Sequence, residues 1–549
     1  MTHFLKKNNF IFYLIIFTTI ICLINLKDFG IGIEEHFQRK SGFYWLNYLL
    51  NFSNFDILKK EVFLKINEIN EFTPNLFPIE KVPYYGVLFD LPMALIEIIF
   101  SIKEPVDYFL LRHFVIILIF LISSYFFYKL IFLKFRNYSL ALFGFLIYVY
   151  MPRVYGNIFF DNKDIFFLSI FTITIYFLTK YLKFNKTTDL IFFSIFCAFS
   201  TSTRIIGIFL PLSFIVFLFF KTLDDNYYKK NFKILFLFAF IYIFTLFLHW
   251  PYLWTLNLSE FLNFFTPFFQ AMNPIVFFGG EFYQSKYLPL YYLPKWIFIS
   301  TPIYILFFFL VGLLIQIRRL FFRYLNIDKN MKKKNGCLLW KSDNEKIDFF
   351  IFVNFLIIFL MYLSVSLPLL SGWRHFYFLN FFLSYYFLYA LFYIFIYIRN
   401  KKFLKINLKF LLLVFFIINV FKLYLYHPFQ SAYFNLFAKK NNYEIDTQSL
   451  SRVDAIKEIL KDNKDSIIVG TASWTPLEDA RSLIERKYWS KLVFLGTSNL
   501  SKADYIYSNH YYEINFNLNN KYEIPKNFVV YKQYKVDNTR IYTIYKKIN

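Results

Sequence analysis

Cysteine and glycine are scarce in this sequence, which has 3 cysteines and 14 glycines in 549 residues. Cys22, Cys197 and Cys337 stand far apart, which excludes a CxxC metal site and a disulfide framework. The patterns GxGxxG and GxxxxGK[ST] do not occur, so neither kind of glycine-rich nucleotide-binding loop is expected.

Hydrophobic residues, in contrast, make up 58% of the chain, and 82 residues are phenylalanine. A soluble protein does not have this composition, so we expect a polytopic membrane protein. The chain has a net charge of +24. It is rich in Phe, Tyr, Ile, Asn and Lys together, a composition that codon bias produces, so the charge is weak evidence for a nucleic-acid partner. We therefore expect no nucleic-acid partner.

Eleven apolar runs reach or approach the length of about 20 residues that a helix needs to cross a bilayer. They are 10–26, 110–133, 139–152, 165–182, 189–203, 204–220, 232–249, 296–316, 348–368, 375–398 and 408–426. The first follows Lys6 and Lys7 and has no small-residue cleavage site after it, which predicts a retained span. Residues 189–220 would form a helix of about 50 Å, and the polar segment STSTR divides it.

Basic clusters between these runs predict the orientation. Residues 88–102 form a weaker apolar run interrupted by Pro92 and Glu97. If that run lies on the membrane surface, every basic cluster falls on one side, including the Arg- and Lys-rich loop 318–334. Cytoplasmic loops keep such residues, so we expect eleven spans in a bacterial inner membrane, with the N-terminus cytoplasmic and the C-terminus periplasmic.

The unusual polar residues then collect on the outer side. The cytoplasmic loops are short and rich in lysine, with no room for a nucleotide-binding domain. Chemistry is therefore expected outside, where nucleotide-activated donors are absent. A sugar on polyprenyl phosphate suits that side, because its phosphate lies at headgroup level and its tail stays among apolar helices and membrane lipids.

Four motifs carry a resemblance to a known family: EEHF at 34–37, MPRVYGNIFFDNKD at 151–164, GWRHFYF at 372–378 and YHPFQSAYFN at 426–435. Over residues 1–440 the chain resembles the GT-C superfamily of lipid-linked-sugar glycosyltransferases. The nearest likeness is to bacterial family 39 proteins, similar to protein O-mannosyltransferases and lipid A aminoarabinose transferases. The resemblance implies inverting transfer of a hexose or pentose to a lipid, glycan or protein acceptor at the exoplasmic face.

The resemblance also implies an acidic residue of the first outer loop at the reacting centre. Such families usually have Asp-Glu there, whereas this chain has Glu34-Glu35, and which of the two is the general base stays open. Asp164, with Asp161 behind it, matches a further acid of the second loop. That pair suits a divalent metal ion or the positioning of an acceptor, and without His or Cys ligand spacing we assign no metal.

The candidates for binding the donor phosphate are Arg153, Lys163, Arg204, Arg374 and His375. Each also has a simpler interpretation, because arginine, lysine and tryptophan at span ends commonly anchor a helix at the membrane interface. Arg204 is the strongest candidate, since a charge so close to hydrocarbon is costly unless it is paired. His36 is interpreted as a solvated loop histidine.

The composition changes near residue 441, which predicts two domains. Residues 1–440 form the all-α GT-C-type membrane domain, with a first outer loop at 27–109 that includes interfacial helices. Residues 441–549 are expected to form a small periplasmic α/β domain. Its signals are a helical pattern in SRVDAIKEILKD, short strand-like runs, and a hairpin around Asp537 and Asn538.

Two other functions compete with the glycosyltransferase. A transporter or flippase of lipid-linked saccharides would place charges near the bilayer midplane and repeat its halves. Here the charges gather on one face and no repeat is found. An inactive scaffold would tolerate the loss of Arg204 and Arg374.

Overall fold

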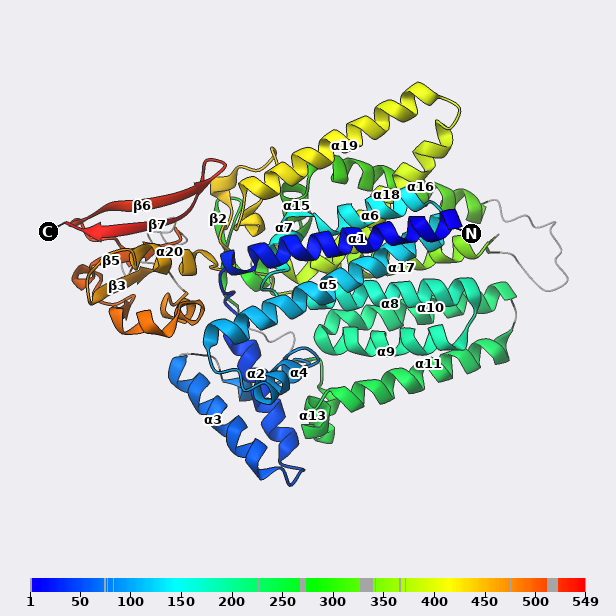
Figure 1. Cartoon of the computed structure of the whole chain (residues 1–549). Coiled ribbons are helices and arrows are strands. Elements are labelled where there is room, and N and C mark those ends of the chain that lie inside the picture. The colour runs from blue at the N-terminus through cyan, green and yellow to red at the C-terminus, as the bar shows by residue number, and fades with distance from the viewer. Residues whose placement is uncertain are drawn as a thin grey trace.

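The computed structural model describes residues 2–73, 76, 78–81, 83–225, 227–266, 273–325, 339–340, 342–364, 367–370, 372–473, 475–510 and 522–548. Long helices lie side by side in a bundle, and a small domain with a β-sheet stands beyond one end of it (Figure 1). Cys337 and most of the basic loop 318–334 lie outside the described residues.

Nine helices in the described part are long and apolar enough to cross a membrane, so the chain is a multi-pass membrane protein. They are α1 (Thr2–Asn25), α5 (Pro105–Phe135), α8 (Asp164–Phe184), α10 (Phe209–Asp225) with its preceding turn η3 (Ile205–Ile208), α11 (Tyr228–His249), α16 (Ile303–Leu325), α17 (Asp343–Ser364), α18 (Asn380–Tyr397) with η5 (Arg374–Leu379), and α19 (Lys402–Leu425). Each corresponds to a predicted span.

The other two predicted spans form shorter helices. α9 (Thr187–Thr203) has 17 residues, and α6 (Tyr138–Val149) has 12, or about 18 Å. Pro152 separates α6 from α7 (Pro152–Asn157), because Met151 before it adopts an extended conformation. Local sequence thus divides this part of the chain into helices shorter than a full crossing.

Residues with left-handed backbone conformations end two of the spans. Arg136 after α5 and Asn185 after α8 both have φ of 52°. Asn137 then begins α6, where its side chain accepts a hydrogen bond from the backbone N–H of Leu140. These turns bring α5, α6, α8 and α9 together as neighbours.

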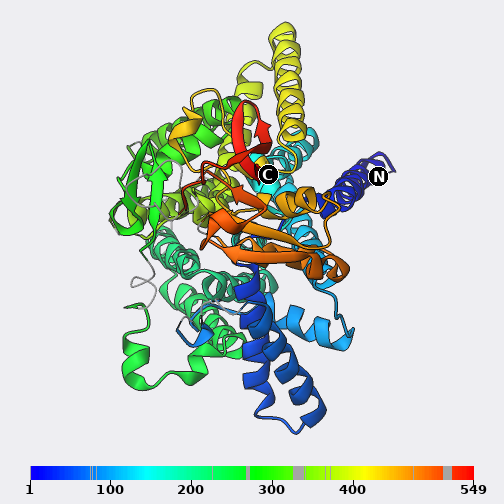
Figure 2. The same ribbon diagram turned by 90° about the vertical axis from the view of Figure 1, so that its left-hand side faces the viewer.

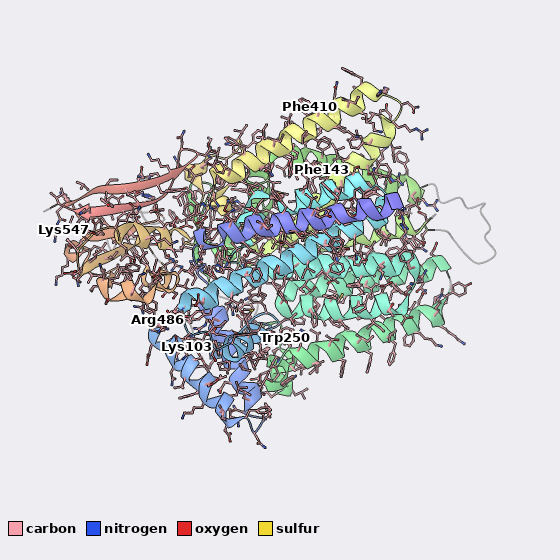
Figure 3. The ribbon with its side chains drawn as sticks, viewed as in Figure 1. Lys103, Phe143, Trp250, Phe410, Arg486 and Lys547 are labelled. Atoms are coloured by element: carbon pink, nitrogen blue, oxygen red, sulfur yellow. The ribbon has the colours of Figure 1, made fainter. Side chains whose placement is uncertain are left out.

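The helices differ in how deeply they lie. α8 and α18 are mostly buried inside the bundle, whereas α11 and α19 expose most of their apolar side chains. Phe410 on α19, labelled in Figure 3, is 67% exposed. Large exposed apolar side chains on such helices mark the surface that lipid covers.

The predicted first outer loop, residues 27–109, contains α2 (Glu35–Leu50), α3 (Asp56–Phe72) and α4 (Asp90–Ile99), which lie together at the same end as the small domain (Figure 1). α4 lies within the weak apolar run at 88–102, and with 10 residues it is too short to cross. It packs on α2, and Arg39 and Glu97 form a buried ion pair between the two helices.

The small domain contains α20 (Ser451–Ile459) and a five-stranded sheet of order β4-β3-β5-β7-β6. β3 (Ile467–Ala472) pairs in parallel with β4 (Leu492–Gly496) and β5 (Tyr505–Ser508). β6 (Phe528–Val536) and β7 (Thr539–Lys547) form the hairpin predicted around Asp537 and Asn538. Figure 2 looks onto this end, with the sheet beside α2 and α3. A second hairpin, β1 (Ile275–Phe278) and β2 (Glu281–Gln284), gave no clear sequence signal.

Candidate active site

Glu34 and Arg374 form an ion pair although 340 positions separate them in the sequence. Glu34 precedes α2, and Arg374 begins η5 at the start of the span that continues as α18. The Arg374 side chain is 3% exposed and that of Glu34 is 35% exposed. The carboxylate therefore remains accessible, while its cationic partner is held by the protein, with Gln448 of the small domain 3.5 Å from Nη1 of Arg374.

Asp164 and Arg204 form a second ion pair at the same end of the bundle. Asp164 is the first residue of α8, and Arg204 follows the last residue of α9. Both charges suit their places, because a helix N-terminus favours an anion and a helix C-terminus favours a cation. Oδ2 of Asp164 is buried and has no hydrogen-bond partner among the described residues.

Lys163 is close enough to both pairs for the charges of Arg204, Glu34 and Asp164 to act on it. Its Nζ is 3.0 Å from the centroid of the Tyr85 ring, which gives a cation–π contact. Burial and the nearby charge of Arg204 lower the pKa of Lys163 to about 7. The charge of this lysine is therefore poised to change near neutral pH.

The cations converge on Glu34. Burial by itself raises the pKa of Glu34, but the charges of Arg374, Lys163, Arg204 and His375 outweigh it and hold that pKa well below its ordinary value. The structure thus gathers Glu34, Asp164, Lys163, Arg204, Arg374 and His375 from four segments of the chain.

Glu35, in contrast, points into the protein. It is 2% exposed, its Oε1 accepts a hydrogen bond from the backbone N–H of Gly32 at 2.7 Å, and its Oε2 lies 2.8 Å from Nε2 of His113 on α5. Both oxygens are therefore occupied by protein groups. Glu35 fixes the turn that presents Glu34.

Asp161 caps the start of α8. Its Oδ1 accepts backbone N–H groups from Asp164 at 2.8 Å and from Lys163 at 3.3 Å. Burial and the neighbouring charge of Asp164 raise the pKa of Asp161. Within the described ranges, no group of three His, Cys, Asp or Glu side chains is placed to hold a metal ion.

Arg153 forms no ion pair with a residue in the described part of the chain and is held by other contacts. Its Nε donates to the backbone oxygen of Tyr433 at 3.1 Å, and its guanidinium lies 4.8 Å from the rings of both Trp296 and Phe434. Burial lowers the pKa of Arg153 to about 10, which leaves it charged at neutral pH. These contacts join α7 to α15 (Tyr292–Ser300), which carries Trp296, and to the segment after α19.

His36 is not solvated as the sequence analysis expected. It is 6% exposed, and its Nε2 lies 3.0 Å from the backbone oxygen of Asp479 in the small domain. Burial lowers its pKa to about 4, so the ring is neutral at pH 7. The docked small domain covers it, which the local sequence does not reveal.

An apolar groove of about 490 Å³ opens between α16, α17, α18 and α15 (Tyr292–Ser300). Phe376 and Leu379, which follow Arg374 in η5, form part of its lining. The groove therefore begins close to the charged cluster and runs among the membrane-spanning helices.

Sequence reasoning missed three residues of this region: Tyr85, His113 and Gln448. Tyr85 lies in a loop without periodic pattern, and His113 is one polar residue within a long apolar run. A histidine within a predicted membrane span is a signal that was available for His113, because ionisable residues there are costly and usually functional. The sequence around Gln448 contained no signal of this kind.

Comparisons with known proteins bear on the same segments. Residues 91–250, from α4 to the end of α11, match the sequence model of a family described as dolichyl-phosphate-mannose-protein mannosyltransferase. A search of curated proteins finds no match. Among solved structures, the crystal structure of ArnT from Cupriavidus metallidurans bound to undecaprenyl phosphate is similar, with 11% identity, coverage of 84% of this chain and 88% of that chain, and a TM-score of 0.42.

Arg153, Lys163, Asp164 and Arg204 lie within the matched residues 91–250. Glu34 and Arg374 lie outside them. It confirms the resemblance to protein O-mannosyltransferase-like members of the GT-C superfamily, over residues 91–250 of this chain.

Proposed function

We propose that this protein is a membrane glycosyltransferase that moves a sugar from a polyprenyl-phosphate-linked donor to an envelope acceptor on the periplasmic face. The family match over residues 91–250 supports the reaction class. The observation that carries the proposal is the accessible carboxylate of Glu34 among the cations Lys163, Arg204 and Arg374.

Transfer to a hydroxyl acceptor needs a base for the acceptor proton and positive charge for the departing phosphate. We assign the base to Glu34, because both oxygens of Glu35 already contact the Gly32 N–H and the His113 ring. Glu35 and His113 then act as positioning residues. Arg374, Arg204 and Lys163 are assigned to the phosphate, with His375 beside them.

The low pKa of Glu34 makes it a weak base while Arg374 is paired with it. A donor phosphate would compete with the carboxylate for the same cations. As the phosphate takes their charge, the carboxylate is released and its pKa rises. Donor binding would thus activate the base only when a leaving group is in place.

The apolar groove beside η5 supports a donor that carries a lipid tail. Its residues, among them Phe376, Leu379 and Phe382, offer an isoprenoid chain an apolar path that begins near Arg374. Arg153 donates to the backbone oxygen of Tyr433 and lies over the rings of Trp296 and Phe434, so we assign it to supporting that loop rather than to the phosphate.

The test compares envelope glycans by mass spectrometry in three strains. One has the gene deleted, and the other two are the same deletion strain expressing either the wild type or Glu34→Gln. A sugar that is missing without the protein should return with the wild type, and its transfer rate should fall at least about a hundredfold with Glu34→Gln, the usual contribution of a general base. The missing sugar also identifies donor and acceptor together.

Glu61→Gln is the matched control, because Glu61 is an exposed carboxylate on α3 of the same outer loop. It should transfer at the wild-type rate. If Glu34→Gln restores the sugar as fast as Glu61→Gln does, Glu34 is not the base. Equal glycans with and without the protein would contradict the proposed reaction itself.

A further inference from the structure

A second cavity, lined by several charged residues, lies at the opposite end of the bundle from Glu34. α5 connects the two ends: Glu104 before its first turn pairs with Arg486 of the small domain, and Lys134 in its last turn pairs with Asp348 of α17. The 31 residues of α5 make it about 45 Å long. This cavity is therefore separate from the candidate active site.

The cavity has a volume of about 520 Å³ and lies between the last turns of α16, the first turns of α17 and the end of α18. Its lining includes Gln316, Arg318, Arg319, Arg323, Asp348 and Tyr393. Three arginines from the last turns of one helix face the N-terminal turn of another, which carries the positive end of the helix dipole.

The acids of the cavity already have cationic partners. Asp348 lies 2.7 Å from Nζ of Lys134 and accepts a hydrogen bond from the Tyr385 hydroxyl at 3.0 Å. Glu345 lies 3.6 Å from Nε of Arg323. This leaves the charges of Arg318 and Arg319, neither of which forms an ion pair with a residue in the described part of the chain.

Those two arginines are exposed at the cavity, and Arg319 lies 4.4 Å from the centroid of the Tyr393 ring. Gln316 adds a hydrogen-bond acceptor to the cavity. It is fully buried, its Nε2 donates to the backbone oxygen of Asp348 at 2.5 Å, and its Oε1 has no hydrogen-bond partner among the described residues. A buried acceptor of this kind is costly unless a hydroxyl or N–H reaches it.

The outer surface of the same turns is apolar. Leu314, Phe321 and Leu325 on α16 are each more than half exposed, and their spacing places them on one face of the helix. In a membrane this face meets acyl chains. A molecule in the cavity thus has arginines on one side and lipid chains beside it, at the level where headgroups lie.

We infer that this cavity binds the headgroup of an anionic phospholipid, with its phosphodiester between Arg318 and Arg319 and a headgroup hydroxyl donating to Gln316. Arginine forks suit phosphate oxygens, and basic pockets between membrane helices recognise such headgroups. A lipid is favoured over free phosphate because the lipid-facing stripe of α16 adjoins the arginines.

The test uses native mass spectrometry of the full-length protein released from phosphatidylcholine nanodiscs that contain phosphatidylglycerol. The wild type should retain phosphatidylglycerol in preference to phosphatidylcholine. The double variant Arg318→Gln/Arg319→Gln should retain less phosphatidylglycerol than the wild type, by at least about tenfold. Both side chains are exposed, so the replacements leave the buried Lys134–Asp348 pair in place.

Lys401→Gln/Lys402→Gln is the matched control, because it removes two exposed charges that follow α18 and lie outside the cavity lining. It should retain the lipid as the wild type does. Equal retention by the two double variants would overturn the proposal. Displacement of the lipid by added inorganic phosphate would also overturn it, because the site would then select a free anion rather than a membrane lipid.

Discussion

Lys163 has a charge that changes near neutral pH. Its pKa of about 7 means that the unliganded lysine is protonated below that pH and neutral above it. A bound phosphodiester favours the protonated form, so binding above pH 7 requires uptake of a proton. Donor affinity is therefore expected to be flat below pH 7 and to fall by up to about tenfold per unit above it.

Lys163→Arg should remove this dependence, because arginine keeps its charge throughout that range. The measurement is donor affinity between pH 6 and 9 for wild type and variant in the same detergent. A wild-type profile as flat as that of the arginine variant would contradict the assignment of Lys163 to the phosphate.

Glu34 and Glu35 are adjacent residues with opposite surroundings. The sequence placed both near the membrane and left their roles open. The turn before α2 decides between them, since it directs Glu35 to His113 and Glu34 to Arg374. The partners come from α5 and η5, and no local pattern around residues 34–35 encodes that difference.

At the level of elements, α16 and α18 cross closely at Gly312. A Cβ added there would lie 2.0 Å from the backbone oxygen of Tyr386, so the backbones would have to separate. Small residues permit such crossings in membrane bundles. Gly312→Ala should therefore lower the free energy of unfolding by about 1–3 kcal/mol, as overpacking does.

Gly144→Ala is the comparison, because a Cβ at Gly144 would lie closest to the end of a side chain, Cδ1 of Leu388 at 2.7 Å, rather than to backbone atoms. Thermal unfolding of the purified protein, followed by tryptophan fluorescence, measures both variants. Gly144→Ala should unfold close to the wild type. If Gly312→Ala also unfolds at the wild-type temperature, the close crossing of α16 and α18 does not limit stability.

At the level of the whole molecule, the small domain holds the loop that carries Glu34. Arg452 is 1% exposed and donates hydrogen bonds to the backbone oxygens of Ile31 at 3.2 Å and Pro476 at 2.7 Å. A Cβ at Gly30 would lie 2.2 Å from the backbone oxygen of Leu450, so that loop and the domain are in direct contact.

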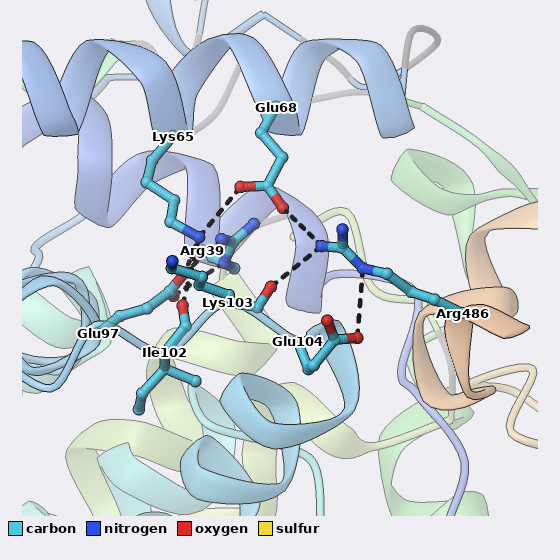
Figure 4. A network of polar contacts seen from close by, with 8 residues as sticks. All are labelled: Arg39, Lys65, Glu68, Glu97, Ile102, Lys103, Glu104 and Arg486. Atoms are coloured by element: carbon cyan, nitrogen blue, oxygen red, sulfur yellow. Dashed lines mark hydrogen bonds and ion pairs between the residues drawn. The ribbon is translucent and has the colours of Figure 1, made fainter.

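A second set of contacts joins the small domain to α3 and to the start of α5. Arg486 of the small domain reaches Glu68, Glu104 and the backbone oxygen of Lys103, as Figure 4 shows. In Figure 3, Arg486 and Lys103 lie where the small domain meets the first outer loop. These ion pairs are partly exposed, and such pairs contribute little to stability.

Arg452→Met should therefore lower transfer activity at least about tenfold and increase hydrogen exchange in residues 30–36, because buried backbone oxygens lose their donor. Arg486→Met should change activity less than about twofold. Activity assays and hydrogen-exchange mass spectrometry measure both effects. Unchanged exchange in residues 30–36 of Arg452→Met would mean that the domain does not hold this loop.

The sequence by itself determined the membrane class, the position of the long apolar helices, the strands of the tail and the segments that carry acids and cations. Apolar length and strand alternation are local properties, so they can be read without a fold. Tertiary structure alone decided which charges meet. The pairs Glu34–Arg374 and Asp164–Arg204 depend on how helix ends from distant segments come together, and Coulomb attraction acts through space rather than along the chain.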